Sequence, residues 1–315
     1  MNSNVNITQK SALAIISSNT PSTDELVNIA KEIREEHFGK NVIIHILSNA
    51  KSGNCSEDCA FCSQSAHYNS AIPEYDLKSD DELYAEAKYA YEIGAGKFCI
   101  VTATRSAFPS LVAELCPTIS RIKENFSNLT ICLSLGFLNN DEASKLKRAG
   151  ADRYNHNLET SERYFPSLVS THTWRERYET LLTARQHGFE LCCGGIIGAG
   201  ETDEDIVDFL FSLKGLDPES VPINFFNPRP GTPLQDAKSI SAEKALRVLA
   251  LARLLLPHTD IRAAGGREKV LGALQKKALQ CVTSIFSNGY LTTAGQGFES
   301  DLKMIEEIGY RIEKE

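Results

Sequence analysis

The sequence lacks the features that would place it in a membrane or on a nucleic acid. Its most apolar helical stretch, ALRVLALARLLLP from Ala245, contains two arginines and is too short to span a bilayer. Lys and Arg number 33 against 41 Asp and Glu, which gives a net charge of −8, and no basic stripe stands out. Because phosphate neutralisation supplies most of the affinity for nucleic acids, such a chain binds them poorly. We expect no membrane and no nucleic-acid partner.

The first residues, MNSNVNITQKSALAIISSN, lack the charged start, long apolar run and cleavage site of a signal peptide, so we expect a cytoplasmic protein. No tandem repeat, low-complexity segment or Pro/Gly-rich linker is visible. The nine cysteines are an odd number, and in a reducing compartment they argue against a disulfide framework. Metal binding or catalysis is the better explanation for them.

Short β-branched, apolar runs recur along the chain, and helical patterns lie between them. The runs are NVIIHILSNA, KFCIVTA, LTICLSLG, ADRYNHNLE, ELCCGGIIG, SVPINFFNP, DIRAAGG and VTSIFSNG. Among the helical patterns, Ser79 or Asp80 can cap one helix and Thr202 another. About eight such units predict an α/β fold, a (β/α)8 TIM-type barrel, with an open doubly wound sheet as the alternative. We expect a helical extension over 1–40 and the barrel over 41–315.

The stretch CSEDCAFCSQS, residues 55–65, places three cysteines in eight residues directly after the first expected strand. We call it the cysteine loop. Thiolates of Cys55, Cys59 and Cys62 suit zinc or an iron–sulfur cluster. Three ligands leave one corner of a four-iron cluster open to a small molecule, whereas a structural zinc site needs a fourth ligand, for which His67 is the candidate. A chance grouping of thiols is the remaining alternative.

The C-x3-C-x2-C spacing, with Phe61 before the last cysteine, resembles the radical S-adenosylmethionine (SAM) superfamily. The resemblance implies a barrel and a [4Fe-4S] cluster on Cys55, Cys59 and Cys62 whose open iron chelates SAM. It also implies reductive cleavage of SAM to a 5′-deoxyadenosyl radical that abstracts hydrogen from an unreactive carbon. The motif by itself says nothing about the substrate.

Further motifs follow in order: SGNCSEDCAFCSQS, YNHNLETS, CCGGIIGAGET, IRAAGGRE and SIFSNGYLTT. Together they resemble the biotin synthase family from about Asn41 onwards. The resemblance implies a radical SAM sulfurtransferase that converts dethiobiotin to biotin, with the sulfur drawn from an auxiliary cluster, nominally [2Fe-2S]. It also implies a homodimer and an electron donor such as flavodoxin or ferredoxin.

The family resemblance implies that four residues on separate strands hold the auxiliary cluster. We call them the lumen set: Cys99, Cys132, Cys192 and Arg262. Taken singly, the cysteines look like ordinary buried strand residues, but a guanidinium on a barrel strand needs an anionic partner. Cys193 is a departure from the family pattern. Adjacent strand residues face opposite ways, so we expect Cys193 in the core, with participation in a different cluster type left open.

The same resemblance implies the contacts of SAM and substrate. Those expected at SAM are Phe61, Asn157, Glu159, Gly195, Ile196 and Gly198, and those expected at the substrate are Asn155, Asn157, Asn224, Thr292 and Thr293. Glu159 stands where the family pattern has aspartate. We expect Arg229 to be a solvated loop charge, although it could also pair with the substrate carboxylate. Rival functions are another radical SAM sulfur inserter or mutase and a non-catalytic metal scaffold.

Overall fold

A computed structural model describes residues 7–313; residues 1–6 of the expected extension and residues 314–315 lie outside it. Its helices are α1 (Gln9–Ser17), α2 (Thr23–Phe38), α3 (Asp80–Glu92), α4 (Pro109–Asn125), α5 (Asn140–Arg148), α6 (Trp174–Gln186), α7 (Asp203–Leu216), α8 (Ala242–Leu255), α9 (Arg267–Leu271), α10 (Gln275–Ala278) and α11 (Phe298–Glu307). Its strands are β1 (Asn41–Lys51), β2 (Lys97–Thr102), β3 (Thr130–Ser134), β4 (Arg153–Asn155), β5 (Glu190–Cys192), β6 (Gly195–Ile197), β7 (Ser220–Phe225), β8 (Asp260–Ala263), β9 (Ser284–Phe286) and β10 (Arg311–Ile312).

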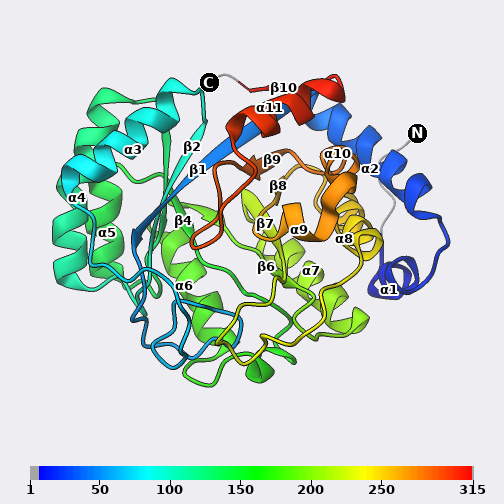
Figure 1. Cartoon of the computed structure of the whole chain (residues 1–315), viewed down its shortest axis with the longest axis horizontal. Coiled ribbons are helices and arrows are strands. Elements are labelled where there is room, and N and C mark those ends of the chain that lie inside the picture. The colour runs from blue at the N-terminus through cyan, green and yellow to red at the C-terminus, as the bar shows by residue number, and fades with distance from the viewer. Residues whose placement is uncertain (1–6, 314–315) are drawn as a thin grey trace.

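The strands close into a parallel barrel (Figure 1). They pair in the order β1-β2-β3-β4-β5-β7-β8-β9, and β9 pairs back to β1. β5 and β6 share one position of the ring because both pair with β7, so eight positions close it. The predicted barrel is therefore confirmed, and the open sheet is wrong. The short strand β10 adds to the start of β1 and was not expected from the sequence.

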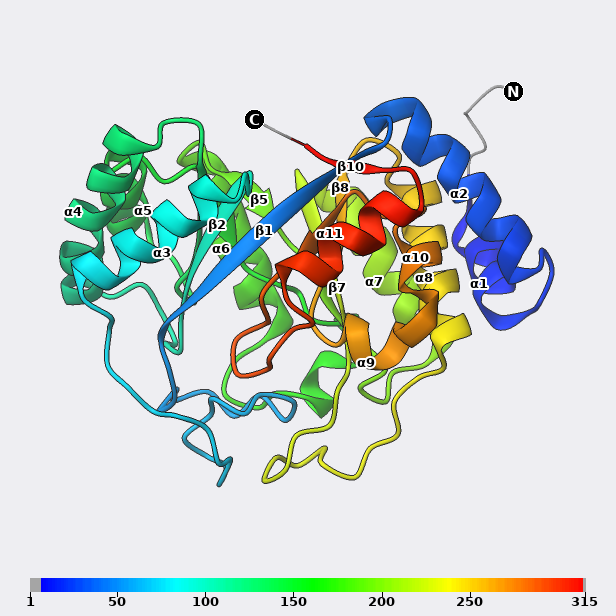
Figure 2. The same cartoon turned by 45° about the horizontal axis from the view of Figure 1, so that its top comes forward.

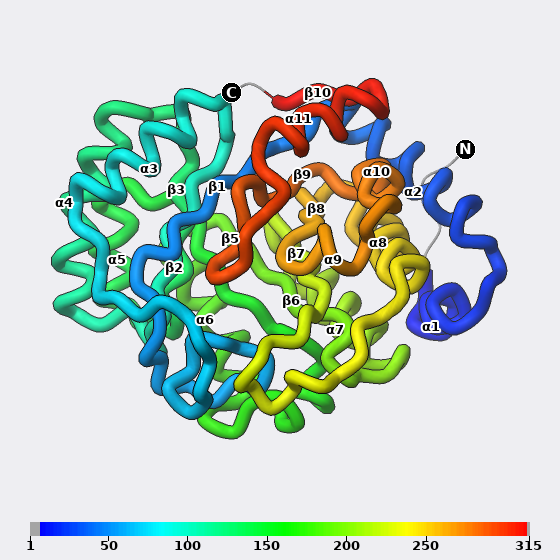
Figure 3. Tube along the Cα trace, in the orientation of Figure 1, coloured from blue at the N-terminus to red at the C-terminus, as the bar shows by residue number. Residues whose placement is uncertain are grey.

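Local sequence signals explain the helix ends. Ser79 caps α3 and Thr202 caps α7, each in a reciprocal capping box with the acidic residue three positions on. The acids of the first turn face the positive end of each helix dipole. Outside the ring, α2 packs on α8, and α1 packs on α7 and α8 (Figure 3). The division of the chain at residue 40 stays a prediction.

The carboxyl ends of the parallel strands meet at one end of the barrel. The segments after β1, β4, β7 and β9 are the long connections there, and Figure 2 shows those after β1 and β7 side by side below the barrel. No helix among residues 7–313 is long and apolar enough to cross a membrane.

The segment between β9 and α11 is held by a buried ion pair. Asp301 is fully buried, and it accepts hydrogen bonds from Arg267 at 2.6 Å and from the Ser287 hydroxyl at 2.8 Å. The amide of Gln296 donates to the same carboxylate at 2.6 Å. Both ends of residues 287–296 are therefore tied to one anion, which fixes the turn that carries Thr292 and Thr293.

Replacing Asp301 with Ala should lower the free energy of unfolding by about 3 kcal/mol, because it leaves the buried Arg267 charge without its main partner. The measurement is guanidinium unfolding followed by the fluorescence of Trp174, the single tryptophan. Glu299→Ala, an exposed change on the same helix, is the control. A difference below about 0.5 kcal/mol between the two variants would show that the pair contributes nothing.

Candidate active site

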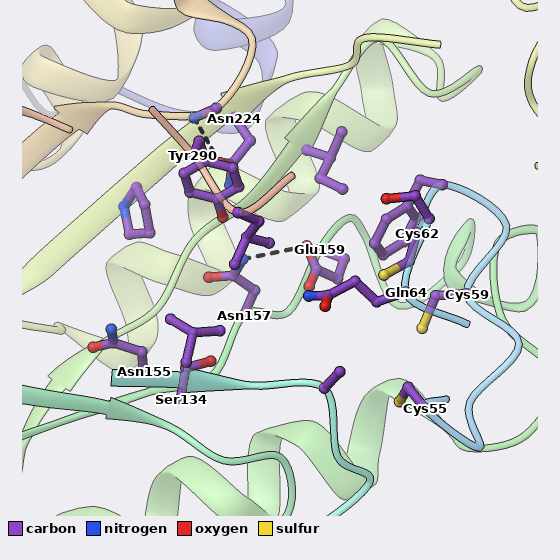
Figure 4. Close-up of a pocket in the computed structure, with 18 of the residues that line it drawn as sticks. Cys55, Cys59, Cys62, Gln64, Ser134, Asn155, Asn157, Glu159, Asn224 and Tyr290 are labelled. Carbon is purple, nitrogen blue, oxygen red and sulfur yellow. Dashed lines mark hydrogen bonds between the residues drawn. The ribbon is translucent and has the colours of Figure 1, made fainter. Parts of the chain in front are cut away.

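A cavity of ≈ 310 Å³ opens where the strands end, within the range of small-molecule sites. The predicted site residues that line it are Cys55, Cys59, Phe61, Cys62, Asn155, Asn157, Glu159, Cys192, Ile196, Asn224, Arg262, Thr292 and Thr293. Figure 4 shows the three loop thiols on one side, with Asn155 and Asn224 across the cavity and Glu159 between. Four predicted residues do not line it: Cys99 and Cys132 in the lumen, and Gly195 and Gly198 behind the wall.

The cysteine loop folds back on itself after β1. Gly53 and Asn54 both adopt positive φ, at 78° and 56°, which turns the chain sharply at the strand end. The Cys55 amide then donates to the Gln64 carbonyl at 3.0 Å, and the Cys62 amide donates to the Cys59 carbonyl at 2.9 Å. These bonds bring all three thiols onto the cavity wall.

The loop thiols are poorly solvated. Burial raises the pKa of each of them, that of Cys62 to about 11, so free thiols here are protonated at neutral pH. Arg177 opposes the rise in all three. Metal binding would deprotonate them. His67, the candidate fourth zinc ligand, directs Nε2 to the Ser56 carbonyl at 3.0 Å. Among residues 7–313, no group of three or more Asp, Glu, His or Cys side chains is placed to hold a single metal ion.

Two acids inside the loop anchor it to the segment after β4. Glu57 is buried and accepts hydrogen bonds from Thr171, His172 and Arg105. Asp58 accepts from the Ser170 amide at 2.9 Å and from the Thr171 amide at 3.1 Å. Burial opposes ionisation of Asp58, but a hydrogen bond from the Ser170 hydroxyl, together with these two amides, holds its pKa well below the usual range. The loop is therefore clamped by charge-assisted bonds on its outer side.

The polar centre of the cavity is built around Glu159. Its carboxylate lies 3.6 Å from the Arg177 guanidinium and 3.4 Å from the Asn157 amide nitrogen. Burial raises the pKa of Glu159, while Arg177 and Asn157 lower it. Arg177 also donates to the Asn157 carbonyl at 2.9 Å. The carboxylate is thus held at the cavity wall with a cation beside it.

The side-chain amides of Asn224 and Asn155 differ in whether their polar atoms have hydrogen-bond partners. Asn224 is satisfied at both ends, since it donates to the Gly195 carbonyl at 3.1 Å and accepts from the Gly265 amide at 2.9 Å. Asn155 instead has a buried carbonyl oxygen with no partner among residues 7–313. A buried acceptor of this kind calls for a donor, which a bound ligand can supply.

Gly194 and Gly195 follow β5, and because they lack a Cβ they allow close contact with neighbouring backbone segments. A Cβ on Gly194 would lie 1.8 Å from the Pro222 carbonyl oxygen, and one on Gly195 would lie 2.3 Å from the Glu159 carbonyl oxygen. The Ile196 amide donates to that same oxygen at 2.7 Å. These glycines let the segment after β4 approach β6, and let the chain between β5 and β6 approach β7. The ligand contact predicted for Gly195, Ile196 and Gly198 stays a prediction.

The lumen set lies deeper in the barrel. Cys99 and Cys132 are register neighbours on β2 and β3, and they cluster with Phe286. Arg262 directs Nη2 to the Cys192 sulfur at 3.8 Å and to the Ser220 hydroxyl at 2.6 Å. A hydrogen bond from Cys132 lowers the pKa of Cys99. Three thiols beside a buried guanidinium are a donor set that fits an anionic iron–sulfur cluster.

Cys193 does not belong to the lumen set. It is fully buried and packs in the main core, outside the cluster of Cys99 and Cys132. Burial raises its thiol pKa above the ordinary value. The position agrees with the expected core role.

Thr292 and Thr293 lie on a tight turn closed by two hydrogen bonds between Tyr290 and Thr293, of 2.9 and 2.8 Å. Arg229 is half-buried, lines the cavity and donates to the Thr293 hydroxyl, with Thr292 at 3.4 Å. The expectation of a solvated loop charge at Arg229 is wrong, because the turn after β9 covers it.

Several polar residues of the site escaped the sequence analysis: Glu57, Arg105, Arg153, His172, Arg177 and Asp260. Glu57 and His172 bind each other across 115 residues of sequence, which no local pattern reveals. Arg153 and Asp260 are different. Each lies two positions from a residue that was predicted, so the period of two along a strand would have found both.

Two family descriptions match the chain. The radical SAM superfamily matches residues 50–213, and the biotin and thiamin synthesis associated domain matches residues 222–311. The chain is 45% identical over 304 residues to the biotin synthase of Salinibacter ruber, covering 96% of this chain and 84% of that protein. It is 43% identical over 307 residues to the biotin synthase of Staphylococcus haemolyticus, covering 98% and 95%.

The chain belongs to the biotin synthase family. The family resemblance and the radical SAM barrel expected from the motifs are thereby confirmed. Among solved structures, methylornithine synthase (PylB) matches with a TM-score of 0.85 at 20% identity, covering 98% of this chain and 95% of that one. The hydrogenase maturase HydG from Carboxydothermus hydrogenoformans matches at 0.83 and 17%, covering 96% and 75%. At these identities the likeness concerns the biotin synthase fold alone.

Proposed function

We propose that this chain is a radical SAM sulfurtransferase that converts dethiobiotin to biotin. The observation that carries the proposal is the placement of two thiol sets around one cavity. The cysteine loop lies at the mouth, and the lumen set lies at the inner end, reached through Cys192 and Arg262. A substrate between them faces both.

The two thiol sets would hold different groups. Cys55, Cys59 and Cys62 suit a [4Fe-4S] cluster, since their loop supplies three thiols and His67 is engaged elsewhere. The lumen set suits an auxiliary cluster, nominally [2Fe-2S]. When bound, the first group supplies an electron for reductive cleavage of SAM and the second supplies the sulfur.

The chain's own residues position SAM between these groups. Glu159 and Asn157 present a carboxylate and an amide to the cavity, and a carboxylate can accept from two sugar hydroxyls. Phe61 lines the same wall. Arg177 keeps charge balance at Glu159, because an unpaired buried carboxylate would be costly.

Dethiobiotin would lie with its ureido ring toward the asparagines and its carboxylate toward the turn after β9. Asn155 offers an unsatisfied acceptor to a ring N–H, and Asn224, like Asn155, lies across the cavity from the loop thiols. Thr292 and Thr293 offer hydroxyls, and Arg229 brings a cation to the same end. We extend the proposal to a cytoplasmic homodimer that receives electrons from a flavodoxin or ferredoxin.

Cys59→Ala should abolish 5′-deoxyadenosine formation, because two thiols cannot hold the cluster that reduces SAM. The measurement is 5′-deoxyadenosine after anaerobic reconstitution with SAM and dithionite. Cys116→Ala, at a half-buried cysteine in α4, is the matched control and should retain the reaction. Undiminished 5′-deoxyadenosine from the Cys59 variant would overturn the radical assignment.

Cys132→Ala should spare SAM cleavage and stop biotin formation, since it removes a ligand of the sulfur-donating group alone. Iron and sulfide per chain should fall relative to the unmutated protein. The control is Cys193→Ala, whose side chain lies in the core, and its iron content should be unchanged. Biotin from the Cys132 variant would contradict the role of the lumen set.

Arg229→Gln should raise the KM for dethiobiotin about tenfold or more, with a smaller effect on kcat, because it removes a charge-assisted bond to the carboxylate. With dethiobiotin methyl ester, which carries no carboxylate charge, the variant and the unmutated chain should perform alike. Arg175→Gln, an exposed change on α6, controls for net charge. Equal losses with acid and ester would exclude carboxylate recognition.

A further inference from the structure

Arg153 lies on the lumen side of β4 although neither the sequence motifs nor the proposed ligand set includes it. It is paired in register with Cys132 on β3, and partners in register share one face of a sheet. Its exposed fraction is 6%. A guanidinium at this depth needs anionic or accepting partners on every side.

Only part of the guanidinium is satisfied. Nε and Nη2 both donate to one carboxylate oxygen of Glu190, at 3.0 and 2.6 Å. Glu190 is in register with Arg153 on β5, and its side chain is half exposed. Nη1 is buried and has no hydrogen-bond partner among residues 7–313. Leaving a buried donor unpaired costs about 1–3 kcal/mol.

The other charged groups of the lumen are already committed. Asp260 accepts from the hydroxyls of Ser220 at 2.8 Å, Thr283 at 2.7 Å and Ser284 at 2.6 Å. It also lies 3.7 Å from Arg262. His45, 3.7 Å from Asp260 on the other side, is neutral, because burial, with Arg262, lowers its pKa to about 3.

The thiols of the lumen set are the remaining candidates for a group that binds the free nitrogen of Arg153. Cys132 on β3 is in register with Arg153, and Cys192 on β5 is in register with Asn155, which lies two residues further along the same face of β4. The lumen therefore holds two buried guanidiniums, three buried thiols and the buried carboxylate of Asp260. An anion at the thiols would balance the charge of this region.

We infer that Arg153 is a second cation of the auxiliary-cluster site, whose free Nη1 donates to the anionic group held by Cys99, Cys132, Cys192 and Arg262. This inference rests on the proposed function, which supplies the anion. A fixed positive charge stabilises the reduced, more negative state of such a group and so raises its reduction potential. The same positive charge also strengthens binding of the anionic group to the protein.

The competing explanation is that Arg153 serves only to pair with Glu190 across β4 and β5. Two variants separate the explanations. Arg153→Met removes the charge and keeps most of the side-chain volume, whereas Glu190→Gln breaks the ion pair and leaves the arginine in place. Arg153→Lys keeps the positive charge and should behave like the unmutated residue.

The experiment uses the full chain in a Cys59→Ala background, reconstituted anaerobically so that the auxiliary cluster is the remaining iron site. The reduction potential is followed by optical and electron paramagnetic resonance titration, and retention by iron release to a chelator. Arg153→Met should shift the potential to a more negative value and speed iron release about tenfold or more. Arg153→Lys and Glu190→Gln should show neither a negative shift nor faster release.

Unchanged potential and release in Arg153→Met, or equal changes in Arg153→Met and Glu190→Gln, would overturn the inference. If Arg153→Met does not fold, as judged by circular dichroism, the decision passes to Glu190→Gln. A more negative potential or faster release in that variant contradicts the inference, and a potential that stays or rises with unchanged release supports it. If the Cys59→Ala chain without further change binds no cluster, the auxiliary site itself fails, and with it the proposed function.

Discussion

The closure of the barrel is the constraint on which the site depends. Once β9 pairs with β1, alternate residues of every strand must point into one enclosed space. Cys99 and Cys132 do so as partners in register on β2 and β3, and Arg262 and Ser284 do so as partners in register on β8 and β9. Water is scarce there, so each polar side chain has to find a partner among residues that strand register assigns to it.

The two thiol sets differ in how rigidly the fold holds them. The lumen set comes from four different strands, and its spacing is fixed by hydrogen-bonded register. The cysteine loop is a single segment whose shape depends on positive φ at Gly53 and Asn54 and on the acids Glu57 and Asp58. One set is thus a property of the whole fold, while the other is a local structure attached to it.

The difference explains what the sequence could predict. The strands, the caps at Ser79 and Thr202, and the three loop cysteines follow from local patterns, and the structure contains all of them. The break of one strand position into β5 and β6 does not, because it arises where Gly194 meets the Pro222 carbonyl of a neighbouring strand. Strand β10 is two residues long and has too little pattern to detect.

The sequence also could not predict which charged side chains bind each other when they lie far apart along the chain. Glu57 and His172 come together only through the folded chain, and no spacing in the sequence relates them. Arg229 was misjudged for the same reason, since the turn that covers it begins about sixty residues later. The sequence analysis missed Arg153 for a different reason. The period of two that placed Asn155 and Asn157 on one face also includes position 153.

Glu159 shows how the local and the long-range constraints combine. Its backbone adopts φ of 68°, and it is held to β6 because its carbonyl accepts from Ile196 at 2.7 Å. A fixed backbone leaves side-chain length as the adjustable quantity. The length of the glutamate side chain places its carboxylate beside Arg177, 3.6 Å away. Glu159 and Arg177 are therefore one electrostatic unit, and a change at either residue has to be judged together with the other.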